Sequence, residues 1–203
     1  MKLKPAYVVI AALGAILVLA VGVIGGRFLA ASPEPGDTST DAGFARDMQR
    51  HHAQAVEMSM LVLERTDSEP VRALAYDIAL TQQQQIGQMF AWLQDWGLPQ
   101  TGSGPPMQWM PDHQMSSAEM GDDQMSMPGM ATDEDLQQLL ESQGPEAERL
   151  YLELMIDHHR GGVQMAQAAL ESASTAQVRD LAGKLIKSQS SEIDAMSTLL
   201  QTL

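Results

Sequence analysis

The segment YLELMIDHHRGGVQMA, residues 151–166, carries the pattern from which the architecture can be worked out. Its apolar and histidine positions continue beyond the segment at intervals of 4, 3, 4, 3 and 4, namely Tyr151, Met155, His158, Gly162, Met165 and Ala169. Such spacing places the side chains along one side of an α-helix, whereas a strand would alternate in steps of two. The segment therefore predicts a long helix with a single inward-facing stripe.

The same pattern occurs earlier in the chain. A shift of 107 residues aligns positions 44–96 with 151–203 without a gap, and sixteen of the 53 aligned pairs are identical. The corresponding first-copy stripe is Phe44, Met48, His51, Ala55, Met58 and Val62. A self-similarity of this length is typical of a duplicated structural unit.

Each copy also contains a second helical pattern, after Ser68 in the first and Ser174 in the second, which we expect to cap those helices. Two helical hairpins with one apolar stripe per helix bury those stripes by packing together. No segment alternates in the manner of a strand. We therefore predict an all-α, ferritin-like four-helix bundle over residues 41–203, built from two duplicated hairpins (44–96 and 151–203).

The interval between the copies is long. Residues 98–131 form a linker rich in Met, Gly, Pro and Asp that we expect to be irregular. Thr132 is then expected to cap a short helix ending near Glu141, and Gly144-Pro145 to begin the next long helix. This interval is long enough to cross the bundle from one end to the other.

The first 31 residues are predicted to direct the protein to a membrane. Lys2 and Lys4 precede residues 7–26, which carry no charge, and Arg27 follows. About 20 apolar residues span a bilayer, whereas the apolar part of a signal peptide has about 7–15. We expect a single-pass anchor in the cell membrane, with a spacer at 32–40 and the bundle on the extracytoplasmic side. Secretion after signal cleavage is the alternative.

Composition excludes several functions. The chain of 203 residues has a net charge of −14, which argues against nucleic acid as a partner, and no Cys, which removes disulfides and thiolate metal sites. Phosphate-binding, dinucleotide-binding and G-x-S-x-G motifs are absent, and no catalytic residue is indicated. The unusual features are 15 Met and 5 His, four of the latter in two His-His pairs.

Those pairs lie in the middle of their helices, so they should meet at mid-height of the bundle. Candidate metal ligands from the helices are His51, His52, His158, His159, Met48, Met58, Met155, Met165, Met89 and Met196. Imidazole suits several transition metals and thioether selects Cu(I), so copper is favoured. A di-iron centre would need Glu-x-x-His motifs, and the chain has none. The alternative is a packed core in which Gln82 or Gln189 bonds the histidines.

The linker offers a second candidate ligand set: Met107, Met110, His113, Met115, Met120, Met125, Met127 and Met130. Mobile thioethers should bind Cu(I) with little dependence on pH, whereas histidine-bound copper should be released as pH falls towards 5. The alternative for the linker is an apolar loop folded over the bundle.

The motifs Met155-x-x-His158-His159 and Gln189-x-x-Glu192-Ile193-x-x-Met196, with their first-copy counterparts, resemble the family called domain of unknown function 305. The Met127-Pro-Gly-Met130 motif also resembles that family's linker. The resemblance implies a ferritin-like bundle, frequent export and, in some members, copper binding. Gln85, where the family pattern has Glu, and Gln49-Arg50 depart from it.

These observations together predict an exported, membrane-anchored protein that binds copper for sequestration or delivery. The partners predicted are a metal ion and the membrane, and no protein partner is indicated. A structural or interaction bundle without metal, and a metal-dependent redox enzyme, are the alternatives.

Overall fold

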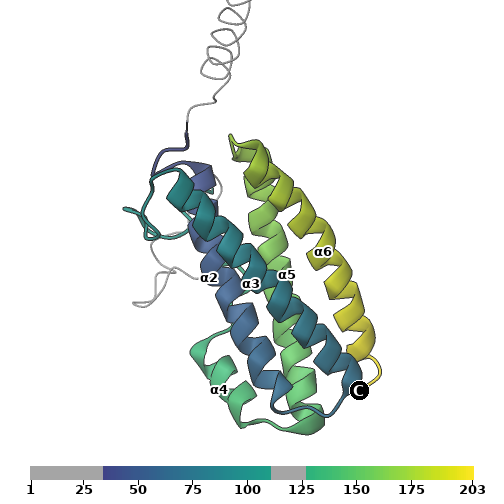
Figure 1. The fold of residues 1–203 in the computed structure, drawn as a ribbon. Helices are drawn as coiled ribbons and strands as arrows, with labels where there is room; N and C mark the ends of the chain where they lie inside the picture. Colours follow the sequence, from purple (N-terminus) through teal and green to yellow (C-terminus); the bar gives the residue numbers. More distant parts are fainter. Residues whose placement is uncertain (1–33, 111–126) are drawn as a thin grey trace, which may run out of the picture. The chain divides into compact units, whose positions relative to one another are not determined.

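A computed structural model describes residues 34–110 and 127–203, and this part of the chain contains five α-helices and no strand. They are α2 (Thr40–Leu63), α3 (Glu69–Asp95), α4 (Asp133–Glu141), α5 (Gly144–Ser172) and α6 (Ala176–Leu200) (Figure 1). The all-α helical bundle expected from the sequence is confirmed. The predicted anchor at 1–31 lies outside the described residues, and among the helices that are described none is long and apolar enough to cross a bilayer.

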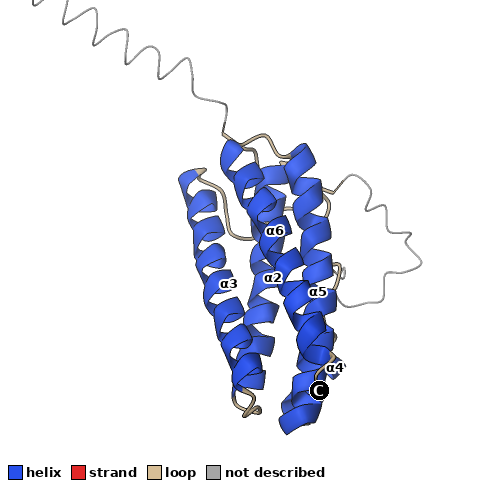
Figure 2. Ribbon diagram, turned by 90° about the vertical axis from the view of Figure 1, so that its right-hand side faces the viewer, coloured by secondary structure: helices blue, strands red, loops and turns tan. Residues whose placement is uncertain are grey.

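The four long helices form two hairpins, α2–α3 and α5–α6, which meet chiefly through α2 and α5 (Figure 2). These two helices run antiparallel. The start of α2 is bonded to the residues that follow the end of α5, and the start of α5 is bonded to a residue that follows the end of α2. Asp41 accepts hydrogen bonds from the backbone and hydroxyl groups of Ser174 and Thr175 at 2.6–2.9 Å. At the other end, the Gly144 amide donates to the Arg65 carbonyl at 2.8 Å.

The caps of the second helices differ in part from the expected ones. Thr175, rather than Ser174, is the N-cap of α6, and its hydroxyl accepts from the Val178 amide. Ser68 is the N-cap residue of α3, but its side chain makes no capping bond. Thr132 forms the expected cap of α4, as a reciprocal capping box with Asp135. The hydroxyls of Ser174 and Thr175 both bond Asp41, and Thr175 is the one that also accepts from an amide of α6.

The interior is divided into two apolar clusters. The first apolar cluster lies near the start of α2 and includes Phe44, Met48, Met89, Met165 and Leu185. The second apolar cluster lies near the end of α2 and includes Met58, Ile78, Tyr151, Met155 and Met196. Each long helix contributes to both clusters, and between these contributions it carries two polar inward-facing residues. A polar layer therefore crosses the bundle at mid-height.

The described parts of the connection between the hairpins lie along α2. Described linker residues bond successive α2 positions: Pro99 bonds Arg46, Pro128 bonds His51 and Ala131 bonds Gln54. Further on, the Leu140 carbonyl in α4 accepts from the Arg65 side chain. The described parts of the predicted linker, 98–110 and 127–131, contain turns and no helix.

Candidate metal centre

The polar layer, here called the histidine layer, consists of His51, His52, Gln82, Gln85, His158, His159, Gln189 and Glu192. The four imidazoles have no exposed surface. The rings of His51 and His158 lie against each other across the α2–α5 interface, with centroids 3.8 Å apart. Within each pair the centroids are 6.4 Å (His51–His52) and 6.3 Å (His158–His159) apart. The two histidine pairs thus meet in the bundle centre, as their mid-helix positions predict.

Three of the four imidazoles are oriented by a hydrogen bond at Nε2. Nε2 of His51 faces the Pro128 carbonyl at 3.1 Å, and Nε2 of His159 faces Oε2 of Glu192 at 2.7 Å. Nε2 of His52 faces Oε1 of Gln85 at 2.7 Å. A carbonyl oxygen and a carboxylate only accept hydrogen bonds, so each Nε2 carries the proton and donates. This tautomer leaves a lone pair on Nδ1 of each of these three rings.

The remaining polar atoms of the layer have no partner. Nδ1 of His51, His52 and His159, and both ring nitrogens of His158, are buried without a hydrogen bond. The side-chain amides of Gln82 and Gln189 are likewise unpaired, so they do not bond the histidines as the packed-core alternative supposed. The side chains that do bond histidines, Gln85 and Glu192, lie three residues after Gln82 and Gln189, respectively. A buried polar group without a partner costs about 1–3 kcal/mol, so a purely packed core accounts poorly for this layer.

This arrangement fits the donor set that a transition metal requires. A histidine that ligates a metal characteristically donates its other ring N–H to a carbonyl or carboxylate, which fixes the tautomer. His51 and His159 show that pattern, and Nδ1 is the nitrogen left free. Among the described residues, however, no three His, Asp or Glu side chains are already arranged around one ion position. The layer supplies buried, unpaired ring nitrogens without a finished coordination shell.

Burial favours the neutral form of three imidazoles, His51, His52 and His158. It lowers the pKa of His51 to about 4 and that of His52 to about 3, and it lowers the pKa of His158 in the same direction. Neighbouring imidazoles lower these pKa values further. Protons therefore compete with a cation for these nitrogens only in more acidic solution than the sequence alone suggests. For a metal held by His51, His52 or His158, the release expected near pH 5 moves to lower pH, because that expectation used an unperturbed pKa of about 6.5.

The candidate methionines of the helices lie on both sides of the layer. Met48, Met89 and Met165 belong to the first apolar cluster and Met58, Met155 and Met196 to the second, all without exposed surface. The linker methionines Met107, Met110 and Met127 are also buried in the first cluster, and Met130 packs against it. These four form part of the core, as the apolar-loop alternative predicts. His113, Met115, Met120 and Met125 lie outside the described residues.

The linker turn Met127–Met130 covers the layer. The sequence analysis did not predict this contact. Gly129 has a φ of 75°, and a Cβ there would meet the backbone of Asp157 and His158. A Cβ on Gly161 would meet the carbonyl of Pro128. Glycine at both positions allows the Met127–Met130 turn to rest on α5 directly over His158. Gly162 similarly leaves room for the Gln189 side chain. The sequence signal for this contact was the Gly-Gly pair in a helix, together with the Pro-Gly of the linker.

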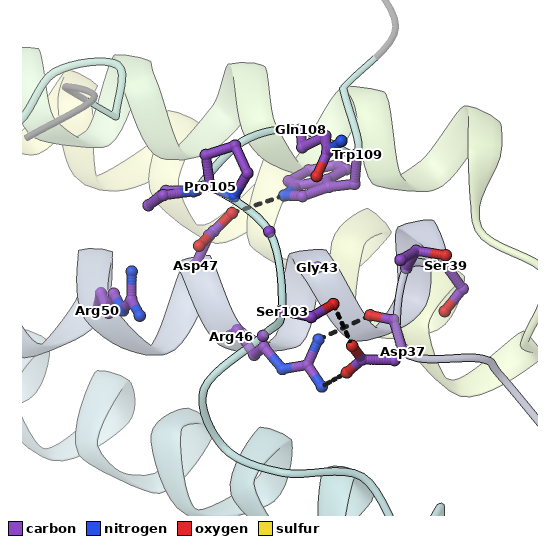
Figure 3. Close-up of a pocket in the computed structure, with 14 residues that line it drawn as sticks. Asp37, Ser39, Gly43, Arg46, Asp47, Arg50, Ser103, Pro105, Gln108 and Trp109 are labelled. Atoms are coloured by element: carbon purple, nitrogen blue, oxygen red, sulfur yellow. Dashed lines mark hydrogen bonds and ion pairs between the residues drawn. The ribbon is translucent and has the colours of Figure 1, made fainter.

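A second polar region lies near the start of α2, beside a surface pocket (Figure 3). Oδ2 of Asp47 accepts from the Met107 amide at 2.7 Å and from Nε1 of Trp109 at 2.9 Å. Arg46 donates to Asp37 and to the Pro99 carbonyl. We call Arg46, Asp47 and Trp109 the linker latch. The sequence did not indicate it, because the partners of Asp47 come from the linker, about 60 residues further along the chain.

Comparison with known proteins places these features in context. Residues 41–200 match the family described as domain of unknown function (DUF305). A solved structure of a candidate secreted DUF305 protein from Streptomyces coelicolor is 48% identical, with a TM-score of 0.74 over 82% of this chain and 95% of that one. A DUF305 fragment from Deinococcus radiodurans is 32% identical, with a TM-score of 0.68 over 85% and 100%. CopM in its Cu(II)-bound form is 26% identical, with a TM-score of 0.60 over 81% and 97%. No curated protein matches the sequence.

Proposed function

Because the chain belongs to the DUF305 family, we propose that it binds copper at the histidine layer and serves in copper sequestration or delivery. One observation carries the proposal. Five ring nitrogens lie buried and unpaired in one layer, while the opposite nitrogens of three rings are held by acceptors. Such a layer is costly when it only packs, and the cost is removed when a cation accepts the lone pairs.

The chemistry of the surroundings favours copper over the other metals that imidazole binds. Neutral imidazoles suit Cu(II), and thioethers are the soft ligands that select Cu(I). Buried methionines lie on both sides of the layer, as Met48 and Met155 do. The layer contains a single carboxylate, Glu192. One carboxylate supplies too few oxygen ligands for a di-iron centre. The similarity to CopM, solved in Cu(I)- and Cu(II)-bound forms, supports the same metal.

The exported location forms part of the same proposal. Residues 1–31 anchor the protein in the cell membrane, and the bundle binds copper on the extracytoplasmic side. The support is the uncharged run at 7–26 and the similarity to a candidate secreted relative. Fractionation of cells expressing the full chain tests the anchor. Recovery in the soluble fraction, with an N-terminus near residue 32, would replace the anchor with a cleaved signal.

Copper titration of the full chain in detergent tests the central proposal. We expect the wild type to bind Cu(II) tightly and the double variant His51→Ala/His158→Ala to lose that binding. Tyr76→Ala removes an exposed aromatic ring from α3 and serves as the control, with tight binding retained. Circular dichroism establishes that each variant is folded. Unchanged tight binding in the folded double variant would overturn the site and restore the packed-core interpretation.

A further inference from the structure

The two halves of the histidine layer make the same hydrogen bond with different chemistry. In the α2–α3 hairpin, Nε2 of His52 donates to Oε1 of Gln85 at 2.7 Å. In the α5–α6 hairpin, Nε2 of His159 donates to Oε2 of Glu192 at the same 2.7 Å. Gln85 and Glu192 are 107 positions apart, as His52 and His159 are. Geometry and position therefore match, and the difference between the two contacts is the charge of the acceptor.

That difference is large in a buried setting. Glu192 is the one carboxylate that bonds an imidazole of the layer within the described residues. Its side chain is 26% exposed, and the ring that it holds is completely buried. Gln82, Gln85 and Gln189 are neutral amides, so none of them supplies negative charge to the layer. The charge that can balance a bound cation therefore lies on one side of the layer.

A carboxylate and an amide have different effects on the histidine that they orient. Both fix the tautomer by accepting the ring N–H. The carboxylate in addition makes the other ring nitrogen a stronger donor and offsets part of the charge of a bound ion. An ion bound through neutral ligands alone brings its whole charge into the core, which is costly. The His159 half should therefore bind a divalent cation more tightly than the His52 half.

We propose that the histidine layer is an asymmetric site, in which Cu(II) binds first through His159 supported by Glu192, and the half formed by His52 and Gln85 binds more weakly. The inference rests on the copper function proposed above and adds the order in which the two halves of the layer bind Cu(II). Glu192 acts as a positioning residue, since it reaches the ion through His159. Gln85 limits the layer to one preferred half.

Reciprocal exchange of the two acceptors tests this order. Cu(II) affinity of the full chain is measured at one pH for the wild type, Glu192→Gln, Gln85→Glu and the exchanged double variant. Loss of such an outer partner weakens metal binding by about 10- to 100-fold. We expect that loss for Glu192→Gln, tighter binding for Gln85→Glu, and near wild-type affinity for the exchange. Glu153→Gln on the exposed side of α5 removes one charge elsewhere and should leave the affinity unchanged.

Histidine substitutions locate the preferred half. In the wild type, His159→Ala should weaken Cu(II) binding more than His52→Ala, and in the exchanged variant this order should reverse. Thermal unfolding monitors the fold of each variant. Equal losses for the two histidine variants, or a Glu192→Gln affinity equal to that of Glu153→Gln, would overturn the asymmetry while leaving copper binding intact. A wild type that binds no Cu(II) would overturn both the asymmetry and the proposed function.

Discussion

The histidine layer and the linker latch both include buried polar residues of α2, one turn apart, and they differ in how fully their polar atoms are paired. In the latch, the Asp47 carboxylate accepts two hydrogen bonds and the Arg46 guanidinium donates three. In the layer, five ring nitrogens lack a partner. A satisfied buried network holds a fold together, whereas an unsatisfied one marks a place where a ligand completes the bonding. Within α2, the latch therefore serves the fold, and the layer is the region to which the proposed copper binding is assigned.

The largest difference should appear when the metal-free protein is acidified. The unfolded chain binds protons at His51 and His52 near pH 6.5, whereas the folded protein does so only near pH 4 and 3. The free energy of unfolding should therefore fall as pH decreases from about 6.5 to about 4, by up to about 1.4 kcal/mol per pH unit for each histidine. Urea unfolding in the presence of a chelator at several pH values measures this slope.

A variant isolates the contribution of the layer. Burial raises the pKa of Asp47. Over part of this range, protonation of Asp47 therefore increases the free energy of unfolding as pH falls, which is opposite to the effect of the histidines. Asp41, whose pKa is lowered, loses its contribution only below its ordinary value of 3.8. The double variant His51→Gln/His52→Gln should therefore show a smaller loss of stability between pH 6.5 and 4 than the wild type. Equal pH profiles for the two proteins would show that these imidazoles do not set the slope.

Removal of the latch carboxylate should destabilise the protein strongly. Asp47→Ala leaves the Met107 amide and Trp109 Nε1 buried without an acceptor, at about 1–3 kcal/mol for each group. We expect the free energy of unfolding at pH 7 to fall by about 2–4 kcal/mol. Asp77→Ala on the exposed surface of α3 is the matched control, with an effect within about 0.5 kcal/mol. Similar values for the two variants would show that the latch contributes little.

The close contact between the Met127–Met130 turn and α5 is tested through a glycine of that helix. Gly161→Ala places a Cβ against the Pro128 carbonyl, so the turn must shift or α5 must bend. Overpacking of this kind costs about 1–3 kcal/mol. Gly183→Ala on α6 meets no atom within 4 Å and should instead stabilise by about 0.5–1 kcal/mol. Thermal unfolding of both variants measures the difference, and a stabilised Gly161→Ala would contradict the close contact.

Periodicity was sufficient to predict the helices and the meeting of the histidine pairs, because mid-helix residues meet whichever way two helices run. It was not sufficient to identify hydrogen-bond partners. Gln82 and Gln85 both face inward on α3, three residues apart, and the path of α3 past α2 decides which of them reaches His52. The linker latch and the contact of Gly161 with Pro128 depend on the route of a long connection. No local pattern encodes that route, and the lowered histidine pKa values follow from the same packing.

The smallest effect concerns the layer without metal. His158 has both ring nitrogens unpaired, so its replacement by an apolar side chain of similar volume removes a desolvation cost and forfeits no hydrogen bond. The variant His158→Leu should therefore be as stable as the metal-free wild type or more stable by about 1–2 kcal/mol, in contrast to the loss at Asp47.

Added Cu(II) should raise the melting temperature of the wild type much more than that of the variant, because a ligand stabilises only the folded state that binds it. Thermal unfolding with and without Cu(II) measures both effects on the same samples. If the variant without metal were several kcal/mol less stable, the imidazole of His158 would stabilise the fold as the latch residues do. The histidine layer and the latch would then not differ in this respect.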